Sequence, residues 1–258
     1  MMTDETRTVP STPEKGMIPL PPPELRDHVG DGDFEGLGNY FLNHFKTIGE
    51  LKPNETVLDV GCGSGRMAIP LTTYLNSDAR YEGFDVSREC IAWCKEHITS
   101  RYPNFHFQHA DIYNKFYNPD GKIRPENFVF PYKENPFDFI NLTSVFTHML
   151  PADVEHYFSE ISRVLKKGGS CFITYFIMNR ESIECIRQKK SIINFVDSGK
   201  GYYSPVKDVP EQVLAYDEGF IRGLYRKYGL SIQEPVYYAK WSGREDGIQG
   251  QDIIIAVK

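Results

Sequence analysis

A glycine-rich run over residues 57–66, VLDVGCGSGR, combines the residue types best suited to chemistry. Its apolar start passes directly into three glycines at alternate positions: Gly61, Gly63 and Gly65. Glycines let the backbone approach a ligand at positions where a Cβ would block it. A dinucleotide fingerprint would need a further glycine where Arg66 stands. Asp59, just before the loop, would repel a pyrophosphate and suits a positively charged ligand, so a nicotinamide oxidoreductase is disfavoured.

Two further carboxylates close apolar segments downstream. Asp85 follows segment 81–84, twenty residues after the glycine run, where a carboxylate can accept two hydrogen bonds from a ribose. Asp111 follows segment 105–110 and can accept a hydrogen bond from the exocyclic amine of an adenine, with the apolar Ile112 beside it. Together with Asp59, these acids indicate a site for a nucleoside that has a cationic tail and no phosphate.

Two hydrophobic periods alternate along the chain and predict the elements that position these residues. Short apolar runs predict strands near 56–60, 81–84, 105–110, 137–142, 171–177, 231–238 and 252–257. Helical periodicity and N-cap or proline signals predict helices over about 66–75, 88–99, 151–165 and 218–228, with Lys166–Gly169 ending the third. The alternation is typical of an α/β fold with a doubly wound, Rossmann-like parallel sheet, whose ligand crevice lies at the carboxyl ends of the strands.

The remaining segments predict the domain organisation. Residues 1–23 are rich in threonine and proline and are expected to form a flexible N-terminal tail. Residues 24–258 are expected to form a single domain, with 24–50 as an N-terminal lid. Three stretches do not fit the strand–helix rhythm and are expected to be cap insertions on the substrate side: 112–136, 178–216 and 240–249.

Five motifs, in order along the chain, resemble those of the class I S-adenosylmethionine-dependent methyltransferases. They are VLDVGCGSG at 57–65, GFDVS at 83–87, HADI at 109–112, FDFI at 137–140 and RVLKKGG at 163–169. The resemblance covers roughly residues 52 to 258. It implies a seven-stranded sheet whose last strand is antiparallel, and S-adenosylmethionine as the cofactor.

The resemblance also implies the cofactor contacts. Asp59, Gly61 and Gly63 would hold the methionine end, with Cys62 and Gly65 completing the loop. The pairs expected to hold ribose and adenine, the adenine edge, and the methionine and methyl region are, in that order, Asp85 and Val86, Asp111 and Ile112, and Leu142 and Ser144. Arg26 and Tyr40 in the lid could close over the cofactor, and Tyr202, Tyr203, Tyr216 and Trp241 in the insertions could stack on an acceptor or simply pack.

His148 is the candidate catalytic residue. It lies six residues past the end of segment 137–142, in the stretch that adjoins the methyl group in the family. A neutral histidine could accept the proton of an acceptor hydroxyl. The alternative is that His148 packs and fixes its loop. The sequence Asn141-Leu142-Thr143-Ser144 lacks the Asp/Asn-Pro-Pro-Tyr/Phe motif of nucleobase methyltransferases, which disfavours a base as the acceptor.

Composition narrows the partners of the 258-residue chain. With 29 basic and 35 acidic residues and a formal charge of −6, nucleic acid and anionic membranes are unexpected partners. Five scattered cysteines favour a reducing cytoplasm, no long apolar run predicts a membrane helix, and no His, Asp or Glu cluster has metal-ligand spacing. We expect a small-molecule methyltransferase, with an oxygen acceptor such as a sugar favoured. The alternatives are a small-molecule N-methyltransferase and a non-catalytic cofactor-binding module that regulates or scaffolds a partner. The oligomeric state is left open.

Overall fold

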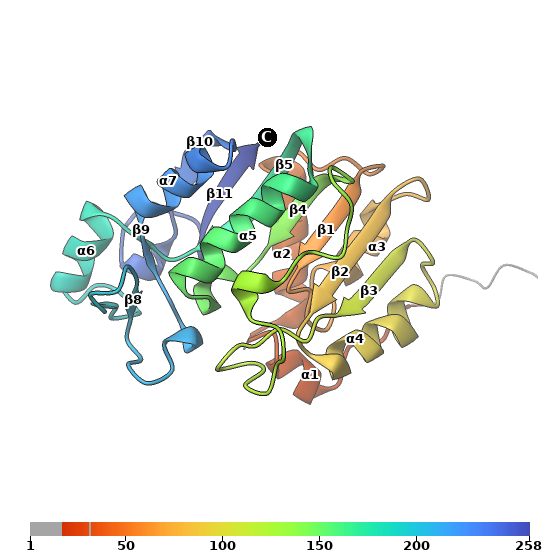
Figure 1. The fold of residues 1–258 in the computed structure, drawn as a ribbon, viewed down its shortest axis with the longest axis horizontal. Helices are drawn as coiled ribbons and strands as arrows, with labels where there is room; N and C mark the ends of the chain where they lie inside the picture. The colour runs from red at the N-terminus through yellow and green to blue at the C-terminus, as the bar shows by residue number, and fades with distance from the viewer. Residues whose placement is uncertain (1–16, 31) are drawn as a thin grey trace, which may run out of the picture.

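A seven-stranded sheet forms the centre of the computed structural model, which describes residues 17–30 and 32–258 (Figure 1). The strands run in the order β10-β11-β5-β4-β1-β2-β3. Their bounds are β1 Thr56–Val60, β2 Arg80–Asp85, β3 Phe105–His109, β4 Phe137–Leu142, β5 Leu165–Tyr175, β10 Ser231–Tyr237 and β11 Asp252–Val257. The pairs among β1 to β5 are parallel, and β11 is antiparallel to both β5 and β10. The predicted α/β fold and its antiparallel last strand are therefore confirmed.

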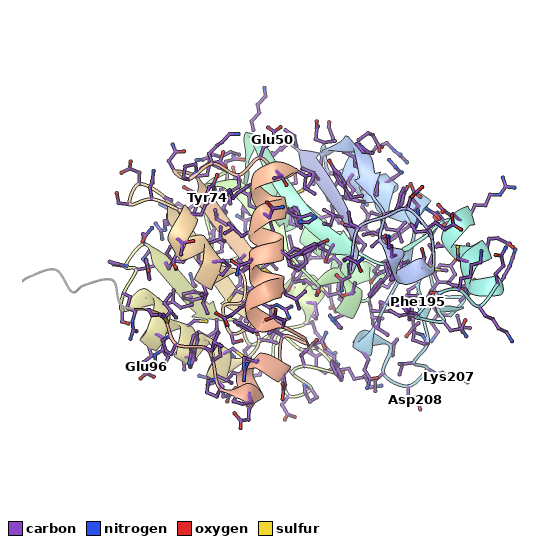
Figure 2. The ribbon with its side chains drawn as sticks, turned by 180° about the vertical axis from the view of Figure 1, so that it is seen from behind. Glu50, Tyr74, Glu96, Phe195, Lys207 and Asp208 are labelled. Atoms are coloured by element: carbon purple, nitrogen blue, oxygen red, sulfur yellow. The ribbon has the colours of Figure 1, made fainter. Side chains whose placement is uncertain are left out.

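Helices cover both faces of the sheet. On one face lie α2 (Phe34–Thr47), α3 (Ala68–Tyr74) and α4 (Arg88–Cys94), which continues as the π-helical turn Lys95–Thr99. On the other lie α5 (Pro151–Val164) and α7 (Glu218–Lys227). Figure 1 shows α5 in front of the sheet, and Figure 2, from behind, shows α2 crossing it. Strand β1 supplies both cores, because Leu58 and Val60 pack with the α5 side and Val57 with the α2 side.

The predicted end of the third helix is wrong in one detail. Helix α5 ends at Val164, and Lys166–Gly169 belong to β5 rather than to a helix end. The register of β4 against β5 shifts between Phe137 and Phe139, and Gly168 has a positive φ of 80°. The backbone of Gly168 and Gly169 pairs with Lys258. The C-terminal strand thus draws these residues into the sheet, a partner that a local helix-end signal cannot reveal.

Smaller elements fill the remaining segments. Residues 17–22 have no regular element and α1 spans Pro23–Asp27, whereas residues 1–16 of the predicted tail lie outside the described residues. Short 3₁₀ turns span Pro125–Asn127, Phe146–His148, Pro210–Gln212 and Lys240–Ser242. Helix α6 (Arg180–Arg187) and four two-residue strands, β6 (Ile177–Met178), β7 (Val196–Asp197), β8 (Tyr203–Ser204) and β9 (Tyr216–Asp217), lie around the second predicted insertion.

The second and third insertions share a small apolar core of their own. Phe176, Phe195 and Trp241 pack together there, with ring centroids 5.2 to 5.4 Å apart. Trp241 and Tyr216 are fully buried, which accounts for these two aromatic side chains by packing. All five cysteines are free thiols. Among residues 17–30 and 32–258, no helix is both long enough and apolar enough to cross a bilayer.

Candidate functional site

A cavity of about 140 Å³ lies at the carboxyl ends of β1, β2 and β4, the edge of the sheet that the sequence predicts for a ligand. Its walls come from the loops after these strands, from the first insertion and from residues 28–29 after α1. The predicted site residues that line the cavity are Asp59, Gly61, Cys62, Gly63, Asp85, Val86, Ile112, Ser144 and His148. The topology therefore brings these residues to one place, and their contacts with a cofactor remain predictions.

The glycine loop after β1 is held against the end of β2. The amides of Gly61 and Cys62 donate to the carbonyl oxygen of Phe84 at 2.9 and 3.1 Å. Gly61 and Gly63 have positive φ of 73° and 51°, a region that disfavours residues with a Cβ. A Cβ on Gly63 would lie 2.1 Å from Cγ1 of Val29. The loop thus presents bare backbone to the cavity, as a closely bound ligand requires.

Asp85 at the end of β2 keeps hydrogen-bonding capacity toward the cavity. Its Oδ2 accepts the amide of Gly63 at 2.8 Å and its Oδ1 accepts the amide of Ser87 at 2.8 Å. Burial raises the pKa of Asp85, and these backbone amides oppose that rise. A carboxylate offers about four acceptor positions. Two therefore stay available for hydroxyl groups such as those of a ribose.

Asp59 is more deeply enclosed, with 2% of its surface exposed. The hydroxyl of Tyr81 donates to Oδ2 at 2.6 Å, and the amide of Asn141, its neighbour across the β1–β4 pair, donates to Oδ1 at 2.9 Å. Burial raises the pKa of Asp59 to about 7, although both hydrogen bonds favour the charged form. A carboxylate in this state gains from a nearby cation, because the cation would lower the cost of its charge.

Ser144 is held in a strained conformation just after β4. Its φ is +60°, which is costly for a residue with a side chain. The amide of Ser144 donates to the hydroxyl of Thr174 at 2.8 Å, and its own hydroxyl donates to Oε1 of Gln251 at 3.2 Å. Strands β5 and β11 thus fix a residue that lines the cavity.

His148 ends a 3₁₀ turn in the loop after β4. Its Nδ1 lies 2.9 Å from the carbonyl oxygen of Glu211, and its Nε2 lies 3.4 Å from the hydroxyl of Tyr117. A carbonyl oxygen can only accept, so Nδ1 carries the proton and the Nε2 of the neutral ring is an acceptor. Burial lowers the pKa of His148. The ring is therefore neutral near pH 7, with its basic nitrogen on the side of Tyr117, which also lines the cavity.

Three predicted cofactor residues do not line the cavity. Gly65 faces α4, where a Cβ would lie 2.8 Å from Ile98, and Leu142 is fully buried in the core. Asp111 is covered by the first insertion: the amides of Lys122 and Ile123 bond to its carbonyl oxygen, and Asn118 approaches its side chain at 3.4 Å. The lid candidates Arg26 and Tyr40 do not line the cavity either, and the Tyr40 hydroxyl donates to the carbonyl of Gln249 at 3.0 Å.

Several lining residues were not predicted as site residues. They include His28 and Val29 after α1, Arg66 after the glycine loop, and Asn114 and Tyr117 in the first insertion. His28 and Tyr117 contact each other edge to face, with ring centroids 5.5 Å apart. Arg66 was noted only as a departure from the dinucleotide fingerprint. The lid and insertion assignments were the available signal for the others, but they did not identify which side chains reach the cavity.

The site fits a positively charged nucleoside. The glycine cradle would admit backbone contact, Asp85 could take the hydroxyls and Asp59 would favour a cation. In the described part of the chain, no group of three His, Cys, Asp or Glu side chains could hold a metal ion. The fold and this site together define the class of Rossmann-like proteins that bind S-adenosylmethionine.

Comparison with known proteins agrees with this class. A family model described as "Methyltransferase domain" matches residues 51–217. Protein 235L of Invertebrate iridescent virus 6 is 24% identical over 207 residues, which is 78% of this chain and 67% of that protein. The 2-phytyl-1,4-naphtoquinone methyltransferase of Nostoc sp. is 27% identical over 127 residues, 48% of each chain. The chain thus spans about half the length of this second relative.

A solved structure shows the same fold. Magnesium protoporphyrin IX methyltransferase from Synechocystis PCC 6803 with bound SAH superposes with a TM-score of 0.55 at 15% identity, over 90% of this chain and 92% of that one. Because the family model covers more than half of the sequence, the chain belongs to the methyltransferase domain family and is an S-adenosylmethionine-dependent enzyme.

Proposed function

We propose that this methyltransferase modifies a hydroxyl group of a small molecule and that His148 is its general base. The observation that carries this proposal is the fixed tautomer of His148: the carbonyl of Glu211 takes the Nδ1 proton and leaves Nε2 as the acceptor. The bound cofactor supplies a methyl group already activated on a sulfonium sulfur. The protein then needs to orient the acceptor and remove its proton.

The proton inventory follows from the ring. Nε2 of His148 accepts the hydroxyl proton of the acceptor while the acceptor oxygen takes the methyl group, and the resulting imidazolium later releases that proton to water. Burial lowers the pKa of His148, which keeps the base neutral and ready at pH 7. Tyr117, whose own pKa burial raises to about 12, stays protonated and can donate to Nε2 until an acceptor replaces it.

The test is product analysis followed by kinetics. Wild-type protein with methyl-labelled cofactor is offered hydroxyl and amine acceptors, and mass determination locates the added methyl. With a productive acceptor, His148→Gln is expected to lower kcat by roughly 10²–10⁴-fold, the range of general-base catalysis, with little change in cofactor Kd. Tyr117→Phe is the matched control, since it removes the hydroxyl beside Nε2 and keeps the base.

Two results would contradict this proposal. Equal turnover in wild type and His148→Gln would leave the histidine with a packing role. Methylation of amines alone would assign the chain to the N-methyltransferase alternative. The pH profile adds a third readout, because kcat should fall on the acid side at a pH below 6.5, the ordinary pKa of histidine, and this limb should vanish in His148→Gln.

A further inference from the structure

Arg66 places a positive charge in the cavity without a full set of partners. The residue follows the glycine loop and lines the cavity. Its Nε is buried and has no hydrogen-bond partner in the part of the chain that the structure describes. Buried guanidinium groups are normally paired, because removing a charge from water is costly. An unpaired donor facing a ligand cavity indicates that a ligand supplies the acceptor.

The neighbouring groups do not fill this role. Asp59 is close enough to Arg66 to interact electrostatically, but its two oxygens already accept from Tyr81 and Asn141. Tyr117 is the other group that interacts electrostatically with Arg66, and burial keeps its hydroxyl protonated. A fork of guanidinium donors therefore points to a planar anion such as a carboxylate, which it can bind through two parallel hydrogen bonds.

We propose that Arg66 binds the carboxylate of the methionine part of the cofactor and makes that carboxylate a requirement for tight binding. This proposal rests on the cofactor site described above. The methionine part of S-adenosylmethionine is a zwitterion, with an ammonium and a carboxylate on one carbon. The cavity offers a carboxylate at Asp59 and a guanidinium at Arg66, close enough to interact. The two side chains match the two charges of that group.

An anionic group on the methyl acceptor is the other source of the same chemistry. The two sources can be separated, because the cofactor can be titrated alone and can be obtained without its carboxylate. Decarboxylated S-adenosylmethionine keeps the sulfonium, the amine and the nucleoside. It therefore reports on the carboxylate contact without any change in the protein.

The experiment is calorimetric titration of the full chain with both ligands. Wild type is expected to bind S-adenosylmethionine roughly ten- to a hundredfold more tightly than the decarboxylated form, the range of one charge-assisted contact. Arg66→Gln should bind both ligands with equal affinity, and Arg66→Lys should show intermediate discrimination, since a lysine keeps the charge and loses the fork. Arg187→Gln, at an exposed site on α6, removes the same charge and should discriminate like wild type.

Each remaining outcome is informative. Wild type that binds both ligands equally overturns the proposal without reference to any variant. Arg66→Gln that discriminates like wild type also overturns it. If Arg66→Gln leaves both affinities unchanged and raises the KM of the acceptor, the carboxylate contact belongs to the acceptor and the proposal is wrong. Failure of wild type to bind S-adenosylmethionine at all overturns the proposed function together with this inference, so the two failures are distinguishable.

Discussion

Asp59 and Asp85 are carboxylates at the ends of neighbouring strands, yet their partners give them different abilities. Asp59 is bonded to two side chains within the sheet, Tyr81 and Asn141. Asp85 is bonded only to the backbone amides of Gly63 and Ser87. The oxygens of Asp85 can still accept hydrogen bonds, whereas Asp59 acts mainly through its charge. That charge is absent from about half of the molecules near pH 7, because burial raises the pKa of Asp59 to about 7.

Cofactor affinity should therefore depend on pH through Asp59. The sulfonium and ammonium charges favour the ionised carboxylate, so binding lowers the pKa of Asp59 and releases its proton. Below pH 7 the affinity should fall by up to about tenfold per pH unit, and above pH 7 it should level off. Calorimetric titrations from pH 5.5 to 8.5, in buffers of different ionisation enthalpy, measure both the affinity and the protons released.

Asp59→Asn is the control for the other titrating groups. The amide retains an oxygen for Asn141 and cannot lose its charge, so the variant should bind more weakly at pH 8 and lack the slope below pH 7. A slope that persists in Asp59→Asn would assign the titration to another group, such as Asp85, whose pKa burial also raises.

At the scale of elements, the segment after α1 closes directly onto the glycine loop after β1. Val29 contacts Gly63 so closely that a Cβ on Gly63 would lie 2.1 Å from its Cγ1, whereas the Cβ of Val29 is 3.5 Å away. Gly63→Ala should lower the free energy of unfolding by the ~1–2 kcal/mol of the positive φ and by a further penalty for displacing Val29. It should weaken cofactor binding as well. Chemical denaturation and titration measure the two effects.

The double variant Val29→Ala with Gly63→Ala isolates the contact between the two segments. Removing the methyl groups of Val29 relieves the clash, so the double variant should lose less than the sum of the single variants, with a coupling of about 0.5–3 kcal/mol. Gly223→Ala, inside α7 with open space at its Cβ, should be neutral or stabilising by up to about 1 kcal/mol. Strictly additive losses would mean that Val29 does not rest on the loop.

The elements that local pattern determines were predictable, and long-range contacts were not. An apolar run that stops at a glycine was enough to predict β1 and its loop, since burial on both faces needs continuous apolar residues. By contrast, Lys166–Gly169 join β5 because Lys258, far along the chain, pairs with them. Asp111 was expected in the site because strand ends are exposed by default, but the first insertion folds back over it. The same limit applies to Val29, which replaces Arg26 and Tyr40 as the lid residue at the cavity.

At the scale of the whole molecule, Asp252 joins the central sheet to the small core of the insertions. Its carboxylate accepts the amide of Ile177 at 2.7 Å, the amide of Ala239 at 2.6 Å and the indole Nε1 of Trp241 at 2.9 Å. Its neighbour Gln251 accepts from the hydroxyls of Ser144 and Thr174. One turn of chain at the start of β11 therefore connects the packing of the insertions with the strained Ser144 of the cavity.

Asp252→Ala should consequently destabilise the protein and disturb the cavity together. Three buried donors lose their acceptor, and each orphaned donor costs about 1–3 kcal/mol, so the loss should be at least about 3 kcal/mol. For a domain of this size that corresponds to a Tm lower by roughly 6 °C or more, measured by calorimetry. Asp252→Asn keeps one acceptor oxygen and should lose less, and Asp246→Ala at an exposed position should leave Tm unchanged. If the cavity depends on this anchor, cofactor affinity at 20 °C should fall in the order wild type, Asp252→Asn, Asp252→Ala. A lower Tm with unchanged affinity would mean that β5 alone holds Ser144 in place.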